Sequence, residues 1–150
     1  MISAQNIIYS DPNTFYTISE IKYYDLSRSK QKIVIRIVRN TDNDIRTLVI
    51  FNPQNTIDTL SLPSSDDFKN FSVTLKNTKN GFELKTIWGG GKNIYYDTFL
   101  FKYFKRTFYL TNIIHSEDIL NTNKTIHKVS NRKIIPALRL DKVKIEKYLE

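Results

Sequence analysis

Hydrophobic residues recur at every second position along much of this chain, most clearly between Phe71 and Ile114. That spacing is the period of a β-strand with one buried face. Within this stretch the pattern predicts strands at residues 71–76, 82–88, 94–104 and 108–114. Because little sequence separates them, we expect consecutive antiparallel strands that form the centre of the fold.

The N-terminal part repeats the pattern, with turn residues between the hydrophobic runs. The predicted strands are residues 6–9, 15–24, 32–38 and 46–51, with a short edge strand at 57–62. Ser10–Asn13 and Asn40–Asp44 are the predicted turns, and Pro53 ends the fourth strand. Asn80-Gly81 favours a hairpin turn because both residues tolerate positive φ, and Lys105-Arg106 is expected to turn a second hairpin.

After His115 the alternation weakens. Ser116-Glu117-Asp118 favours the start of a short helix, and residues 143–149 favour one or two helical turns. The sequence therefore predicts an all-β, mainly antiparallel fold of about seven to nine short strands, in a sandwich or a strongly twisted sheet. At most one or two short helices are expected near the C-terminus, and residues 1–150 are expected to form a single globular domain.

Composition narrows the class of protein. Hydrophobic residues make up 40% of the chain and aromatic residues 13%, which excludes a wholly disordered chain. No apolar run reaches the roughly 18 to 20 residues that cross a bilayer, so we expect no membrane span. The lack of cysteine excludes disulfides, thiolate metal sites and cysteine nucleophiles. We expect a periplasmic location if a signal peptide was removed ahead of Met1, and a cytoplasmic one otherwise.

The formal net charge of +8 raises the question of a nucleic acid, an anionic membrane surface or an acidic protein partner. The basic residues are scattered, with a mild concentration between Lys124 and Lys147, so a solvated basic surface is the simplest interpretation. Tyr23-Tyr24, Tyr95-Tyr96 and Tyr103 leave open a stacking platform for single strands. No RNP-type motif supports it, and we do not expect a nucleic-acid partner.

Gly89-Gly90-Gly91 is the most unusual local feature, because three of the four glycines are consecutive and follow the only Trp. A phosphate-binding loop needs Gly-Lys-Ser/Thr followed by a helix, whereas Gly91-Lys92-Asn93 leads into a predicted strand. A loop or bulge between two hairpins is the plain structural interpretation, and a partner-binding loop is the functional one. The candidate partner-binding residues are Trp88, Gly89, Gly90, Gly91, Lys92 and Tyr95.

The sequence lacks recognisable catalytic and metal-binding patterns. His115 and His127 do not have the spacing of a zinc motif, and no Gly-x-Ser-x-Gly occurs. We therefore expect no metal, no cofactor and no enzymatic activity. Glu83 and Asp97 flank the glycines on neighbouring predicted strands, so a carboxylate pair that acts on or binds carbohydrate is kept as an alternative.

A loop followed by several strands carries a family resemblance. Asp25-Leu26-Ser27-Arg28-Ser29-Lys30 precedes a strand where a family of small β-rich bacterial secreted proteins has a D-x-N-x-D-G loop. The similarity continues through the segments RTLVIF, Asn80-Gly81, Trp88-Gly89-Gly90, Phe99-Leu100-Phe101 with Tyr103, and Phe108-Tyr109-Leu110. The loop itself departs from the pattern: it holds one carboxylate, and Lys30 replaces the turn Gly, so we do not expect calcium there.

The sequence resembles that group, which includes periplasmic lysozyme-inhibitor-like proteins and the immunity proteins of effector–immunity pairs, such as those of type VI secretion. The resemblance implies a non-enzymatic binding protein that occludes the active site of a cognate antibacterial toxin or cell-wall hydrolase. A basic inhibitor would suit a cleft lined with carboxylates. The alternatives are a nucleic-acid-binding β domain and a carbohydrate-binding domain.

Overall fold

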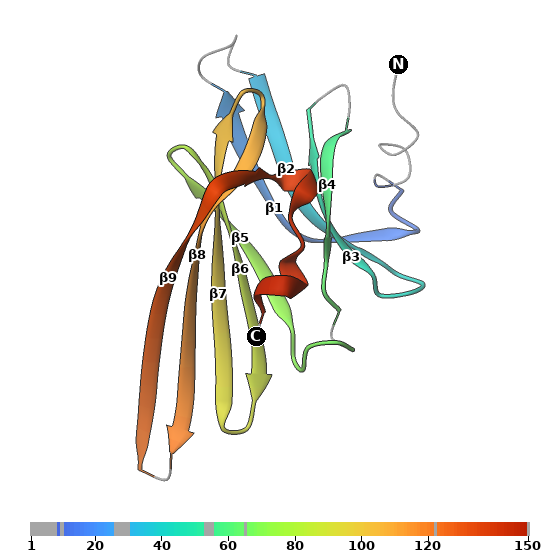
Figure 1. Ribbon diagram of the computed structural model, residues 1–150. Helices are drawn as coiled ribbons and strands as arrows, with labels where there is room; N and C mark the ends of the chain where they lie inside the picture. The colour runs from blue at the N-terminus through green and yellow to red at the C-terminus, as the bar shows by residue number, and fades with distance from the viewer. Residues whose placement is uncertain are drawn as a thin grey trace.

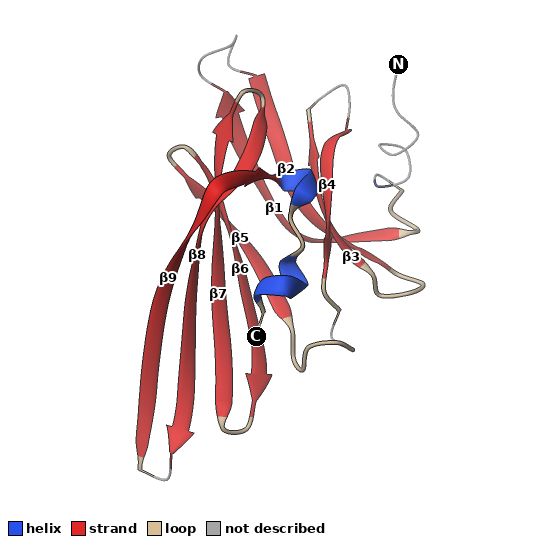
Figure 2. Cartoon of the chain, viewed as in Figure 1, coloured by secondary structure: helices blue, strands red, loops and turns tan. Residues whose placement is uncertain are grey.

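The computed structural model describes residues 9, 11–25, 31–52, 56–64, 66–121 and 123–149. These residues form nine strands and two short 3-10 helices, as Figure 2 shows. The elements are β1 (Phe15–Asp25), β2 (Gln31–Asn40), β3 (Arg46–Phe51), β4 (Thr56–Leu62), β5 (Ser72–Thr78), β6 (Gly81–Gly90), β7 (Asn93–Phe104), β8 (Thr107–Asn121), β9 (Lys124–Arg139), η1 (Leu140–Lys142) and η2 (Ile145–Tyr148).

The strands form two antiparallel sheets, in the orders β1-β2-β3-β4 and β5-β6-β7-β8-β9. Each strand pairs with its neighbour in sequence, so both sheets are meanders. The all-β prediction is confirmed, and the predicted edge strand at 57–62 lies at the edge of its sheet as β4. The predicted strand at 6–9 falls almost wholly outside the described residues, as do residues 26–30 of the calcium-like loop.

One buried hydrophobic cluster joins the two sheets and the C-terminal helices. Alternate residues of β2 and β3, such as Ile35 and Leu48, supply one side, and the phenylalanines of the other sheet supply the other. Phe82 stacks on Phe101 with ring centroids 4.8 Å apart. Each fully buried side chain of this size contributes roughly 1.5–3 kcal/mol by leaving water, so this cluster accounts for the packing of the sheets.

Gly81 is needed for a different reason from the one that the sequence predicts. The β5–β6 turn consists of Lys79 and Asn80, and Gly81 is already the first residue of β6, paired with Thr78. A Cβ atom on Gly81 would lie 2.0 Å from the carbonyl oxygen of Phe101 on β7. The glycine therefore allows two strands to approach closely, and the prediction that it supplies positive φ is wrong.

The C-terminal third differs most from the sequence prediction. The helix expected at Ser116 is wrong, because β8 continues to Asn121 and pairs with the 16-residue strand β9. Nearly every residue of β9 is exposed, so no buried face marks it in the sequence. The helical turn expected within residues 143–149 is present as η2, with Ile145 and Leu149 buried.

The five-stranded sheet is longer than the sheet it packs against, so β6 to β9 extend well past it in Figure 1. We call the extending part the distal half; it comprises residues 86–97 and 115–130. The remainder of β6 to β9, which holds the buried phenylalanines, is the packed half. The inward surface of the distal half continues the core side of the sheet, because residues 95 and 97 alternate in step with buried Phe99 and Phe101.

Candidate functional site

The three glycines lie at the tip of a tight hairpin, so the predicted break between two hairpins is wrong. β6 and β7 pair as far as Gly90 and Asn93, and Gly91-Lys92 form a two-residue turn with Gly91 at φ 66°. Gly89 has φ 106°, and a Cβ atom there would lie 2.5 Å from the carbonyl oxygen of Asn93. The glycines thus have a folding reason, which is to close a twisted hairpin.

A neighbouring turn holds this hairpin in place. The amide of Gly89 donates to the carbonyl of Lys69 at 2.7 Å, and the side-chain amide of Asn70 donates to the carbonyl of Gly89 at 3.0 Å. On the opposite side, the amide of Leu120 on β8 donates to the carbonyl of Lys92 at 2.7 Å. These bonds make the hairpin tip a fixed part of the sheet.

Trp88 and Tyr95 form a stacked pair on the inward surface of the distal half. They lie opposite each other on β6 and β7, with ring centroids 4.4 Å apart and planes 24° apart. Phe68 packs edge-on against Trp88 at 5.1 Å. Both rings of the pair are half-buried, and the Nε1 atom of Trp88 is buried with no hydrogen-bond partner among the described residues. Trp88 and Tyr95 are two of the six candidate partner-binding residues, and the structure places them side by side.

Asp97 and His115 complete this surface one pair further along the strands. The Nδ1 atom of His115 lies 2.7 Å from the Oδ1 atom of Asp97, and the His115 ring lies parallel to that of Tyr95, with a centroid separation of 6.2 Å. Asp97 is 1% exposed, and its Oδ2 atom lacks a hydrogen-bond partner among the described residues. Burial raises the pKa of Asp97, an effect that the bond to His115 opposes. No sequence motif marks this pair, because its members are 18 residues apart.

An oriented histidine beside a carboxylate is also found in nucleophilic active sites. Ser130 lies opposite His115 on β9, so Asp97, His115 and Ser130 form a row across three strands. Hydroxyl attack requires a contact between serine and histidine, and within the described part of the chain the only side-chain bond of the row is that from His115 to Asp97. Asp97 therefore orients the imidazole of His115, but that imidazole is not bonded to the Ser130 hydroxyl that it would have to activate.

The predicted carboxylate pair is not formed. Asp97 lies on the inward surface, whereas Glu83 alternates with buried Leu84 and so lies on the outer surface, where it pairs with Lys85 at 3.8 Å. The histidines are separated in the same way: His127 pairs with Asp118 on the outer surface. No group of three metal-ligating side chains occurs among the described residues.

The tyrosines that suggested a stacking platform are divided between distant places. Tyr95 lies on the inward surface of the distal half and Tyr96 on the outer surface. Tyr23 and Tyr103 instead pack together at the packed end of the sheet, with ring centroids 5.2 Å apart. They do not form one continuous row with Tyr95.

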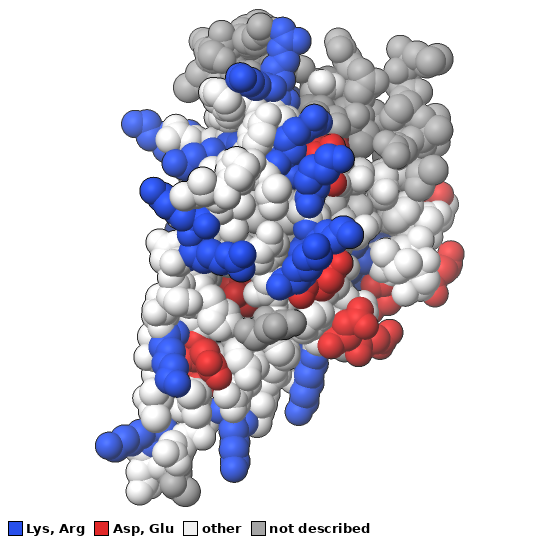
Figure 3. Space-filling view, in the orientation of Figure 1, with Lys and Arg blue, Asp and Glu red and all other residues white. Residues whose placement is uncertain are grey.

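Basic side chains follow the free edge of the five-stranded sheet. Figure 3 shows Lys and Arg gathered on the side of the molecule where β9 lies. Those of β9 are Lys124, Lys128, Arg132, Lys133 and Arg139, all exposed. Lysine on an exposed edge strand discourages pairing with another sheet, and it also gives this edge a positive field.

A scan against protein-family models, a search of curated proteins and a search of solved structures found no match. The resemblance to secreted inhibitors and immunity proteins therefore stays a prediction. Among the described residues no helix is long and apolar enough to cross a membrane.

Proposed function

We propose that this protein is a non-enzymatic binding domain that uses the distal half of its five-stranded sheet to occlude the active site of a protein partner. The observation that carries the proposal is the stacked Trp88–Tyr95 pair, which is half-buried in the distal half, with Trp88 also packed against the core. Trp and Tyr are the residues most often found at the energetic centre of protein interfaces.

The shape of the distal half suits insertion into a cleft. Two hairpin tips, Gly91-Lys92 and the turn between β8 and β9, end this part of the sheet, and the Leu120–Lys92 hydrogen bond ties them together. A preorganised sheet end binds without a large ordering cost. Steric occlusion by such an end requires no chemistry from the inhibitor.

The charge favours a partner whose cleft is acidic. The net charge is +8, and the exposed basic residues of β9 lie along the distal and packed halves alike. Positive charge speeds encounter with a cleft lined by carboxylates and helps to orient the complex. Together with the sequence resemblance, this supports a cognate antibacterial toxin or a cell-wall hydrolase as the partner.

Affinity capture from the native host, followed by an activity assay of the captured protein, tests the proposal. Lys92→Glu reverses a charge at the exposed hairpin tip, and Lys76→Glu makes the same change on exposed β5, outside the distal half. We expect the wild type and Lys76→Glu to capture a stoichiometric partner and inhibit it, and Lys92→Glu to inhibit about tenfold less well. Equal inhibition by both variants, or a captured protein whose activity is unaffected, would contradict the proposal.

Carbohydrate binding is the second candidate, favoured by one observation. Beside the Trp88–Tyr95 stack lie a buried donor, Trp88 Nε1, and a buried acceptor, Asp97 Oδ2, neither of which has a hydrogen-bond partner among the described residues. Aromatic faces beside free polar groups are typical of ligand sites. A glycan array probed with the wild type and with Tyr95→Ala decides this point: a signal that the substitution removes would favour a sugar, and silence would reject one.

A further inference from the structure

A separate site lies at the end of the five-stranded sheet opposite the distal half. It is a cleft of about 630 Å³ between β1 of one sheet and the β7–β8 hairpin of the other, which is within the usual size of small-molecule sites. The cleft exists because β6 begins at Gly81, opposite Lys102, so the last two residues of β7 extend past β6. On the β6 side, the carbonyl of Asn80 accepts a hydrogen bond from the amide of Tyr103 at 2.7 Å.

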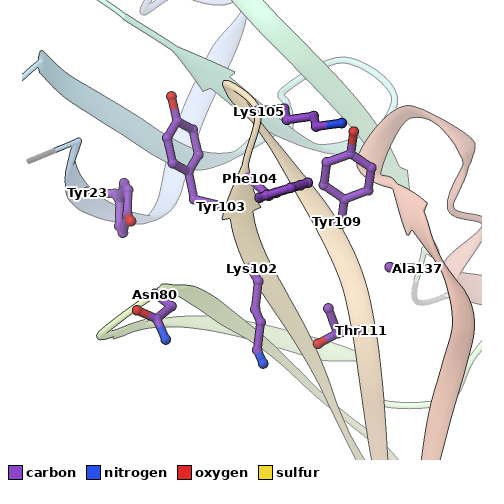
Figure 4. A pocket seen from close by; sticks show the side chains of 9 residues that line it. All are labelled: Tyr23, Asn80, Lys102, Tyr103, Phe104, Lys105, Tyr109, Thr111 and Ala137. Carbon is purple, nitrogen blue, oxygen red and sulfur yellow. The ribbon is translucent and has the colours of Figure 1, made fainter. Parts of the chain in front are cut away.

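Aromatic rings form much of the cleft wall. Phe104 is 60% exposed and contacts Tyr109 edge-on at 6.2 Å. Tyr103 and Tyr23 pack against buried Phe108, which fixes their positions. Figure 4 shows Tyr109 and Phe104 on one side of the hairpin and Tyr23 on the other. The exposed face of Phe104 is a surface on which a planar ring can stack.

Two lysines make the cleft cationic. Lys105 places its ammonium 5.3 Å from the centre of the Phe104 ring, and in Figure 4 Lys102 extends toward the Thr111 side. Both are exposed, and within the described part of the chain neither forms an ion pair. No Asp or Glu occurs among the described residues that line the cleft. An anion is therefore the charged group that this site accepts.

The turn that carries Lys105 is built at a conformational cost. Lys105 and Arg106 both have positive φ, 49° and 67°, in the two-residue turn between β7 and β8. Asn-Gly or another glycine pair is the favourable choice for such a turn. Strained residues of this kind concentrate at functional sites, and here the strained pair presents a cation beside an exposed ring.

We propose that this cleft binds a free nucleotide, with the base stacked on Phe104 beside Tyr109 and the phosphate held by Lys105. A nucleotide combines the two features that the wall supplies, a planar ring and an anion joined by a linker that can form hydrogen bonds. The site is distinct from the distal half and does not depend on the proposed partner.

Calorimetric titration of the full chain at low salt tests the proposal with thymidine monophosphate, thymidine and inorganic phosphate as probes. We expect the monophosphate to bind at least about tenfold more tightly than either fragment, because only it contacts both the Phe104 ring and Lys105. Lys105→Ala is expected to weaken the monophosphate about tenfold and leave thymidine unchanged, and Phe104→Ala to weaken both. Lys76→Ala, an exposed lysine outside the cleft, is the control for net charge.

Three outcomes would overturn the proposal. Phosphate binding as tightly as the monophosphate would show a general anion surface, and equal effects of Lys105→Ala and Lys76→Ala would show non-specific charge. Tighter binding of a short oligothymidine than of the monophosphate would replace the free nucleotide by a nucleic-acid strand. Circular dichroism of each variant keeps these results interpretable, because exposed Phe104 and Lys105 are not part of the buried core.

Discussion

The packed and distal halves of the five-stranded sheet share the same strands, the same pairing and the same alternation, yet they differ in what the inward surface carries. Along β7 the inward residues change from Phe101 and Phe99 to Asp97, Tyr95 and Asn93. Asp97 is still buried like the phenylalanines, and the inward surface becomes half-exposed only beyond it, at Tyr95 and Asn93. Alternation thus identifies a strand without showing how far along it the core extends.

The largest expected effect separates the two halves by stability. Phe99→Ala removes a fully buried ring from the packed half and should lower the free energy of unfolding by about 3–5 kcal/mol. Tyr95→Ala removes a half-buried ring on the same surface of the distal half and should cost about 1–2 kcal/mol. Urea unfolding measures both. Similar losses would mean that the distal surface belongs to the core after all.

The glycines allow the hairpin of the distal half to be tested next. Gly89→Ala introduces a Cβ atom that would lie 2.5 Å from the carbonyl oxygen of Asn93 at φ 106°, and should cost about 2–3 kcal/mol. Gly91→Ala, at φ 66° with no atom within 4 Å, is the matched control and should cost about 1 kcal/mol. Thermal unfolding of the two variants compares them. A larger loss for Gly91→Ala would contradict the role given to close strand approach.

Asp97 lies at the boundary between the two halves, and its titration should change the free energy of unfolding with pH. Burial raises the pKa of Asp97 in the folded state above the usual 3.8, which applies to the unfolded chain. Between 3.8 and the raised pKa, the folded state therefore binds more protons than the unfolded state. Stability contributed by this group therefore falls as pH rises through that window and recovers as pH is lowered. Asp97→Asn should remove this fall from the profile of unfolding free energy against pH.

The difference profile, wild type minus Asp97→Asn, cancels the contributions of other carboxyls such as Asp58, whose pKa burial also raises. Asp66→Asn, on an exposed turn, controls for the loss of one negative charge. A difference profile that rises with pH over the window would contradict the assignment, because it would require a lowered pKa for Asp97.

The smallest effect concerns the hairpin turns at opposite ends of the sheet. The distal turn has one residue with left-handed φ, Gly91, whereas the turn at the packed end has two, Lys105 and Arg106. Replacing that pair with Asn-Gly, as Lys105→Asn with Arg106→Gly, should raise the free energy of unfolding by about 1 kcal/mol. The same variant should bind the nucleotide about tenfold more weakly, as Lys105→Ala does. A variant that is less stable than the wild type would show that the pair is not strained.

Much of the fold can be predicted from alternation and turn residues, since β1 to β7 lie close to the predicted strands. The end of β8 and the whole of β9 cannot be predicted in this way, because most of their residues are exposed and no alternation with buried residues marks them as strands. For the site, the sequence identifies Trp88 and Tyr95, but not their pairing with His115 and Asp97. That pairing depends on register across β7 and β8, which local sequence does not specify.

The most direct test of the central claim is hydrogen–deuterium exchange on the complex with the captured partner, compared with the free protein. The account predicts that slowing of exchange is concentrated in residues 86–97 and 115–130, with Lys92→Glu reducing it. Protection confined to the packed half, or spread evenly over the chain, would contradict the assignment of the distal half as the binding surface.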